Sequence, residues 1–406
     1  MDRLFSEKMY LQQELMEHFD LNQEMTDEEI NHYIEEKILL RARKRPLLLE
    51  EKQMLKKELF NTFRRLDVLS DLLEDEDITE IMVNGVDKIF IEKEGRLIGL
   101  KDSFSSEERL RNIIQQIVSS CNRIVNETVP IVDARLQDGS RVNVVLPPIA
   151  LDGAVLTIRK FPKELFTMDK LIEMGSITKE AAQFLKSLVI AKYNLFISGG
   201  TGCGKTTFLN VLSNYIPNDE RVITIEDSAE LQIKNIPNLV RLETRNANVE
   251  GENAIPMSAL IKSALRMRPD RIIVGEVRDA AAMDMANSML TGHDGSISTG
   301  HGNSAKEMLL RLETMILMGY DMPVLAIRQQ LASAIDVIIH LGRLRDNSRK
   351  VMEITEIMGI KDGEIVTRPL FEFKELKECN GRVVGKLEKK EDLFHIKKLQ
   401  QSGLVR

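Results

Sequence analysis

The sequence predicts an α/β protein, because short apolar strands alternate with helices over residues 178–370. A helix in "TKEAAQFLKSLVIAKY" precedes a strand at Leu195 to Ser198, and further strands follow in "RVITIED" and "RIIVGE". Helices lie between and after these strands, as in "PMSALIKSALRM", whose apolar residues share one face. Such alternation is typical of a mostly parallel sheet with helices on both sides.

Two regions of different composition precede this part of the chain. Residues 1–75 are rich in Glu, Lys, Leu and Met at helical spacing, which predicts a helical N-terminal region. Residues 76–160 carry short strand-like runs broken at turn residues, which predicts a separate α+β domain. We expect a linker at 161–177, the α/β domain at 178–370 and a charged C-terminal tail at 371–406.

Composition restricts the classes of function. The 406 residues carry a formal net charge of −7, which argues against a general nucleic-acid-binding protein, since such a protein normally presents a basic face. Charges occur throughout the N-terminal segment and no run of 18 apolar residues exists, so we expect neither a signal peptide nor a membrane span. Three widely spaced cysteines indicate free thiols in a reducing cytosol, not disulfides or a zinc site.

One glycine-rich stretch, "FISGGTGCGKTTFLN", fits the pattern G-x-x-x-x-G-K-[ST] in full between a strand and a helix. Glycines let backbone N–H groups curl around phosphates, and the helix N-terminus adds the positive end of its dipole. Lys205 would reach the β- and γ-phosphates, and the Thr206 hydroxyl would take a Mg²⁺ position. A plain glycine-rich turn is the disfavoured alternative. The predicted nucleotide-binding residues are Gly199, Gly200, Thr201, Gly202, Cys203, Gly204, Lys205, Thr206 and Thr207.

Hydrolysis also needs a carboxylate that positions or deprotonates water. Glu226 and Asp227 follow one apolar strand and Glu276 follows another, where active sites of open α/β sheets lie. A solvated loop residue is the alternative for any single acid of this kind. Two such strand ends downstream of a phosphate loop favour a hydrolytic site.

Two histidines, His293 and His301, lie in the stretch "TGHDGSISTGHGNS". Each ring could donate a hydrogen bond to an anion, which allows a phosphate-sensing role. A structural role is the alternative for either histidine taken alone. Zinc binding is disfavoured because no cysteine or further histidine lies nearby.

Taken together and in this order, the acidic box "ITIEDSAEL", the segment "IIVGEVRD" and the two-histidine box give the chain a family resemblance. The sequence resembles the secretion ATPases of type II and type IV secretion systems and of type IV pili, over about residues 70–360. The blocks "ITEIMVNG", "DARLQDGSRVNVVLPP" and "LTIRKF" look most like the Tad/Flp pilus-assembly branch, CpaF-like. The tetracysteine zinc module frequent in the type II branch has no counterpart here, which favours the Tad/Flp or type IV secretion branch.

The resemblance implies roles for individual residues. Glu226 resembles the water-activating glutamate, Glu276 the Walker B glutamate that supports Mg²⁺ and water, and His293 and His301 match the histidine box. Three further residues match arginines of the N-terminal domain that reach nucleotide: Arg135, Arg141 and Arg159. Surface charge is the alternative for these arginines, and for Arg135 the two interpretations are about equal.

The resemblance also implies a RecA-like motor domain in a hexameric ring of identical subunits, on the cytoplasmic side of an inner-membrane platform. We therefore expect a Mg²⁺-dependent ATPase that powers assembly or secretion of pilin-like subunits, with ATP and Mg²⁺ as cofactors. A RecA-like motor acting on nucleic acid is one alternative, which the acidic composition disfavours. A nucleotide-gated scaffold with little turnover is the other, which Glu226 and Glu276 disfavour.

Overall fold

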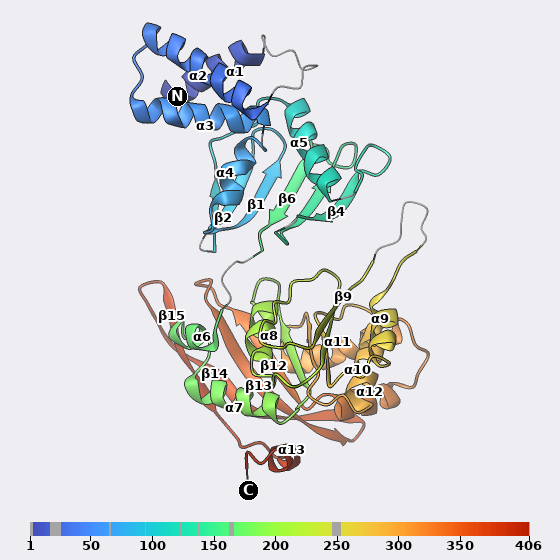
Figure 1. The fold of residues 1–406 in the computed structure, drawn as a ribbon. Coiled ribbons are helices and arrows are strands. Elements are labelled where there is room, and N and C mark those ends of the chain that lie inside the picture. The colour runs from blue at the N-terminus through green and yellow to red at the C-terminus, as the bar shows by residue number, and fades with distance from the viewer. Residues whose placement is uncertain are drawn as a thin grey trace. The chain divides into compact units, whose positions relative to one another are not determined.

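The computed structural model describes residues 3–16, 26–64, 66–93, 95–121, 123–136, 138–161, 166–245 and 253–405. The chain forms two compact units, Met1–Lys163 and Glu164–Arg406 (Figure 1). In the described residues, no helix is both long enough and apolar enough to cross a bilayer.

The first unit begins with three helices, α1 (Arg3–Met16), α2 (Asp27–Lys44) and α3 (Leu49–Arg64). Thr26 caps the start of α2, because its side chain accepts a hydrogen bond from the Glu29 N–H and the Glu29 carboxylate accepts one from the Thr26 N–H. The three helices share a small core of their own. Its buried members are Leu11, Leu15, Ile30, Ile34, Ile38, Leu47, Leu55 and Leu59.

A six-stranded antiparallel sheet and two helices form the rest of the first unit. Its strands lie in the order β3-β2-β1-β6-β5-β4. One face of the sheet is buried against α5, whose apolar residues Leu110, Ile113, Ile114, Ile117 and Val118 all point into the core. The elements are α4 (Val68–Glu74), β1 (Ile78–Asn84), β2 (Ile89–Lys93), β3 (Arg96–Gly99), α5 (Glu107–Ser120), β4 (Ile131–Arg135), β5 (Arg141–Val145) and β6 (Val155–Arg159).

The second unit is built on a nine-stranded sheet in the order β15-β14-β13-β12-β7-β11-β10-β8-β9. The six strands from β12 to β9 are parallel, and β13, β14 and β15 continue the sheet in antiparallel pairing. Its strands are β7 (Leu195–Gly199), β8 (Val222–Glu226), β9 (Leu239–Glu243), β10 (Arg271–Val274), β11 (Ile297–Gly300), β12 (Val337–Arg343), β13 (Arg349–Lys361), β14 (Glu364–Cys379) and β15 (Arg382–Lys389). Its helices are α6 (Met168–Glu173), α7 (Lys179–Ile190), α8 (Lys205–Ser213), α9 (Met257–Ala264), α10 (Ala281–Leu290), α11 (Ala305–Leu317), α12 (Val324–Ala334) and α13 (Lys397–Gln401).

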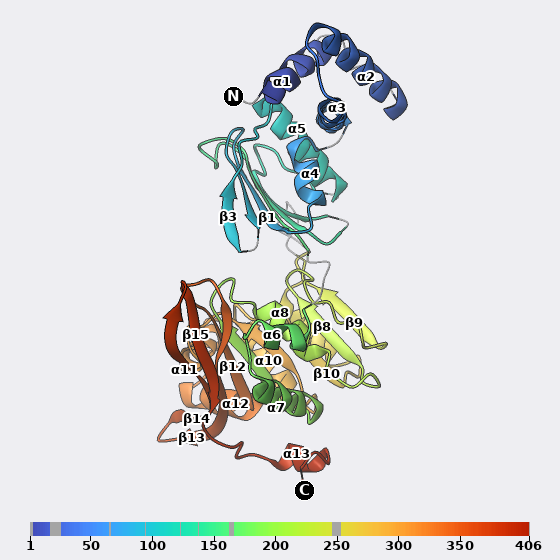
Figure 2. The same cartoon turned by 90° about the vertical axis from the view of Figure 1, so that its left-hand side faces the viewer.

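Helices cover both faces of this sheet, as Figures 1 and 2 show. Successive residues of a strand point to opposite faces, and β7 follows this rule. Leu195 and Ile197 join the core under α7 and α8, whereas Phe196 joins the core under α9 to α12. The central strands β7, β8, β10 and β11 are buried at every position, because helices cover both faces of the sheet there. The predicted α/β class, with a helical region and an α+β domain ahead of it, is confirmed.

The segment expected to be a charged tail, 371–406, instead contributes to the sheet. Residues up to Cys379 extend β14, β15 follows, and α13 lies after it. Only two residues of β15, Val383 and Leu387, are buried. A strand with so little buried surface has a weak hydrophobic pattern, which explains why the sequence did not predict it.

Candidate functional site

The glycine-rich loop connects the end of β7 to the start of α8. Gly202 and Gly204 adopt φ angles of 71° and 95°, which side chains disfavour. A Cβ on Gly199 would lie 2.5 Å from the Leu341 carbonyl oxygen, so no other residue fits there without movement of the backbone. Close backbone packing accounts for Gly199 and left-handed turns account for Gly202 and Gly204, whereas a Cβ on Gly200 would meet no atom within 4 Å.

Lys205, the first residue of α8, is only 8% exposed. Its ammonium donates hydrogen bonds to the carbonyl oxygens of Gly199 and Gly200, both at 3.0 Å, and lies 3.2 Å from His301 Nδ1. The lysine is therefore folded back into its own loop. Oxygen atoms of a bound phosphate could replace these carbonyl acceptors without a change in the charge of the lysine.

Four predicted residues meet at one edge of the sheet. The strands β7, β11, β10 and β8 are parallel neighbours in that order, so their carboxyl ends lie side by side. Lys205, His301, Glu276 and Glu226 each follow or end one of these strands. Ligands of open α/β sheets bind at this edge.

His301 links the lysine to one of the two acids. Its Nε2 lies 2.8 Å from Glu276 Oε1, while Arg278 donates to Glu276 Oε2 at 2.8 Å. Because Lys205 can only donate, Nδ1 of His301 must be the acceptor, which leaves the proton of a neutral ring on Nε2, toward Glu276. Burial lowers the pKa of His301 below its usual value, against the opposing effect of Glu276. Both observations indicate a neutral imidazole at neutral pH.

Glu226, the last residue of β8, is only 3% exposed. Its Oε2 accepts hydrogen bonds from the N–H groups of Glu230 and Leu231 at 2.7 and 2.8 Å. Its Oε1 is buried and has no hydrogen-bond partner in the described part of the chain. Burial raises the pKa of Glu226, and the two N–H donors oppose that rise. A buried carboxylate oxygen without a partner can accept a proton or a hydrogen bond from a bound molecule.

An open cavity of about 660 Å³ lies beside the glycine-rich loop. Two of its wall residues, Asn303 and Arg311, follow His301 on the loop and on α11, and the sequence analysis did not predict them. The one feature of the sequence that could have indicated these two residues is their position shortly after His301. The lining residues are Gly200, Thr201, His301, Gly302, Asn303, Glu307, Leu310 and Arg311.

Arg349 is another residue that the sequence did not indicate. It begins β13, and its Nε donates to the Gly202 carbonyl oxygen at 2.8 Å. The guanidinium therefore supports the tip of the phosphate loop from a distant part of the sequence. No motif marks it, because the contact depends on the antiparallel turn from β12 to β13.

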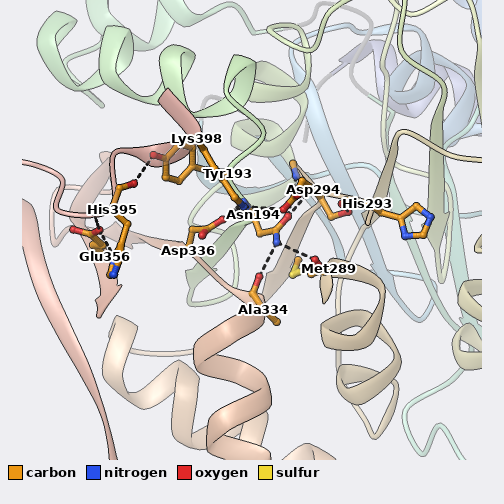
Figure 3. Close-up of polar contacts among 12 residues, drawn as sticks. Tyr193, Asn194, Met289, His293, Asp294, Ala334, Asp336, Glu356, His395 and Lys398 are labelled. Carbon is orange, nitrogen blue, oxygen red and sulfur yellow. Dashed lines mark hydrogen bonds and ion pairs between the residues drawn. The ribbon is translucent and has the colours of Figure 1, made fainter. Parts of the chain in front are cut away.

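His293 lies apart from the other predicted site residues. It precedes β11, whereas His301 follows that strand, so the two histidines stand at opposite edges of the sheet. Figure 3 shows His293 next to a network around Asn194 at the amino-terminal edge. Its Nδ1 lies 3.3 Å from the Ser288 carbonyl oxygen. Within one chain, the spacing of the histidine box therefore does not bring the two rings together.

The three predicted arginines of the first unit form one row across its sheet. Arg135 is paired with Arg141 between β4 and β5, and Arg141 is paired with Arg159 between β5 and β6. Directly paired residues of antiparallel strands point to the same face. The neighbouring residues Val142 and Ile158 are buried, so the arginines occupy the face opposite the core.

The side chains available for a metal ion are few. Among the described residues, no group of three or more His, Cys, Asp or Glu side chains is arranged to hold an ion. Thr206 lies in the first turn of α8 and Glu276 follows β10 at the same sheet edge. One hydroxyl and one carboxylate suit Mg²⁺, which in nucleotide sites completes its shell with phosphate oxygens and water. The residues present fit a Mg²⁺ ion that arrives with a nucleotide.

The phosphate loop on a parallel sheet, with acids at the neighbouring strand ends, defines a P-loop protein. Residues 64–398 match the family described as Type II/IV secretion system protein, and the chain belongs to that family. The chain is 31% identical over 313 residues to the conjugal transfer protein TrbB of Rhizobium radiobacter, covering 76% of this chain and 93% of TrbB. It is also 31% identical over 330 residues to the type IV secretion system protein VirB11 of Bartonella henselae, covering 71% and 91% of the two chains.

A solved structure supports the fold. The Yersinia pseudotuberculosis ATPase DotB superposes with a TM-score of 0.52 at 17% identity, covering 73% of this chain and 79% of that chain. The predicted resemblance to type II and type IV secretion ATPases is confirmed, and the second unit has the RecA-like P-loop motor fold. The comparisons do not distinguish the Tad/Flp branch.

Proposed function

We propose that this protein is a Mg²⁺-dependent ATPase that hydrolyses the β–γ bond of ATP. The observation that carries the proposal is the connected series Lys205–His301–Glu276 beside the buried Glu226, at the carboxyl edge of a parallel sheet. Membership of the secretion family supports the same activity.

Each residue has a defined task in this proposal. Lys205 and the loop N–H groups bind the phosphates. Thr206 and Glu276 provide oxygen ligands for Mg²⁺, which supplies charge neutralisation when it is bound. Glu226 accepts the proton of the attacking water, because its Oε1 is buried and has no other partner in the described residues. His301 holds Glu276 and Lys205 in a fixed relation through its two ring nitrogens.

The arginine row extends the proposal from the single chain to a ring. We place Arg141 and Arg159 on the nucleotide of a neighbouring subunit in a homohexamer, with Arg135 beside them. Arginines supplied across an interface neutralise charge that develops on the γ-phosphate, and in other systems they contribute about 10³ to 10⁵ in rate. His293 lies at the amino-terminal ends of the strands, away from the nucleotide site of its own chain. We therefore assign it contacts with other parts of the ring and no role in that nucleotide site.

The work of the ring is assembly or secretion of pilin-like subunits through inner-membrane platform proteins, at the cytoplasmic face of the membrane. The family name and the secretion and conjugal-transfer relatives support this role. The blocks that resemble the Tad/Flp branch favour pilus assembly within it.

Turnover measured with Mg²⁺ and ATP tests the activity. Wild-type protein should release phosphate, and Lys205→Ala should not, with an unchanged circular dichroism spectrum. The matched control is Lys179→Ala, at the exposed start of α7. Turnover that persists in Lys205→Ala would overturn the assignment. Turnover that requires added DNA would instead favour a motor on nucleic acid, and tight binding without turnover would favour a scaffold.

A further inference from the structure

The turn between α2 and α3 exposes adjacent leucines. Leu48 and Leu49 are 70% and 73% exposed, whereas Leu47 beside them is 9% exposed and belongs to the helical core. Leu39, Leu40 and Met54, on the helices that flank the turn, are also exposed. Adjacent exposed leucines of this kind mark a candidate interaction surface.

The same turn is strongly basic. Residues 37–52 contain six Lys or Arg and two Glu, in a chain whose net charge is −7, and three of the six, Lys37, Arg41 and Arg45, pair with glutamates of α1. Arg43, Lys44 and Arg45 follow one another into the turn, and all three are exposed. Arg45 pairs with Glu7 at 2.8 Å, but Arg43 and Lys44 form no ion pair with any described residue. We call residues 43–49 the basic tip.

We propose that the basic tip docks on a membrane surface rich in anionic lipid headgroups. Lys and Arg near such a surface are attracted to its negative potential, and exposed leucines insert at the boundary between headgroups and acyl chains. The tip supplies both signals within seven consecutive residues, 43–49. The two contributions add, because binding to such a surface grows with the apolar area inserted and with the attraction to anionic lipid.

A lipid surface suits the tip better than an acidic protein does. Two adjacent leucines at a turn do not form a groove or a helical stripe, so a protein partner would need a matching pocket. A fluid interface needs no such pocket. The family match begins at residue 64, so the tip lies outside the part of the chain that matches the family model. The inference extends the proposed location at a membrane and does not depend on ATP hydrolysis.

Vesicle flotation with the full-length protein tests the inference. Wild-type protein should bind vesicles that contain phosphatidylglycerol and should not bind vesicles of phosphatidylcholine alone. The double variant Leu48→Gln, Leu49→Gln should bind at least about tenfold more weakly, because it loses the inserted apolar side chains. The double variant Arg43→Gln, Lys44→Gln should also bind more weakly, and its binding should depend less on salt.

Matched controls separate the tip from general surface effects. Leu151, 92% exposed, and Lys101, also exposed, lie in the sheet part of the first unit. Leu151→Gln and Lys101→Gln should bind vesicles as the wild type does. All variants should retain the wild-type circular dichroism spectrum and ATP turnover, so a failure of the ATPase proposal would be seen separately. Absence of wild-type binding to anionic vesicles, or undiminished binding by both tip variants, would overturn the inference.

Discussion

Gly275 lies directly against Glu226, the proposed general base. A Cβ built on Gly275 would stand 2.9 Å from Glu226 Cγ. The Gly275 N–H donates to the Ile225 carbonyl oxygen at 2.8 Å, which fixes this backbone beside β8. The absence of a side chain on Gly275 therefore leaves room for the Glu226 side chain at the end of β8. This contact gives a physical reason why a glycine, Gly275, stands between the end of β10 and Glu276.

We expect Gly275→Ala to lower turnover by about 10², because the added methyl group displaces the Glu226 side chain. Nucleotide binding should remain, since the phosphate loop is not touched. Steady-state kinetics and a nucleotide-binding titration check both expectations. Gly99→Ala, at the end of β3 in the other unit, is the control and should behave as the wild type. Normal turnover in Gly275→Ala would contradict the proposed role of Glu226.

Glu226→Gln should still bind ATP but hydrolyse it about 10² to 10⁴ more slowly, because the amide cannot accept a proton from water. Binding and turnover measured on the same preparation separate the two effects. Glu276→Gln is the comparison variant. If Glu276→Gln is the more severe lesion and Glu226→Gln is nearly normal, the two carboxylates have exchanged roles.

The pH dependence of turnover offers an independent check on Glu226. Burial raises the pKa of this carboxyl above 4.5, its ordinary value. A base must be ionised, so turnover should fall as the pH drops through a pKa above 4.5. Stability changes in the opposite sense, because a raised carboxyl pKa stabilises the fold at low pH and this contribution is lost as the pH rises through the folded-state pKa. Activity should thus decline on the acid side while circular dichroism stays native, and Glu226→Gln should lack that decline.

The arginine row can be tested by mixing inactive proteins. Lys205→Ala retains its arginines, and the double variant Arg141→Ala, Arg159→Ala retains its phosphate loop. In a mixed ring, the first protein can supply arginines to the intact loop of the second, so partial recovery of turnover is expected. Rings shown by tagged copurification to be mixed, yet without activity, would count against action across the interface.

Lys398 ties the C-terminal segment to the amino-terminal edge of the second sheet. Its ammonium nitrogen lies 2.8 Å from Asp294 Oδ1 and 2.7 Å from Asp336 Oδ2. Figure 3 shows these three residues together with their neighbours. Lys398→Met should destabilise the second unit by about 2 kcal/mol, between the values typical of exposed and buried pairs. The double variant Lys398→Met, Asp336→Asn should lose less than the sum of the single changes in denaturant unfolding. Strict additivity would show that the pair contributes nothing.

Much of the site could be predicted because its chemistry lies in short local motifs. The phosphate loop needs glycines, a lysine and a threonine at fixed spacing, and the acids Glu226 and Glu276 end or follow recognisable apolar strands. Arg349 and Gly275 could not be assigned roles in this way. Each acts on a partner brought near only by the pairing of strands.

The sequence by itself determined the α/β class of the second unit, the identity of the phosphate loop and the residues that follow its strands. Local spacing is sufficient for these features, because each depends on one strand, one turn or one helix start. The tertiary structure alone decided that β11 stands between β7 and β10, and hence that His301 rather than His293 reaches Lys205. The order of strands in a sheet depends on which apolar faces pack together across the whole unit, and no local pattern encodes that order.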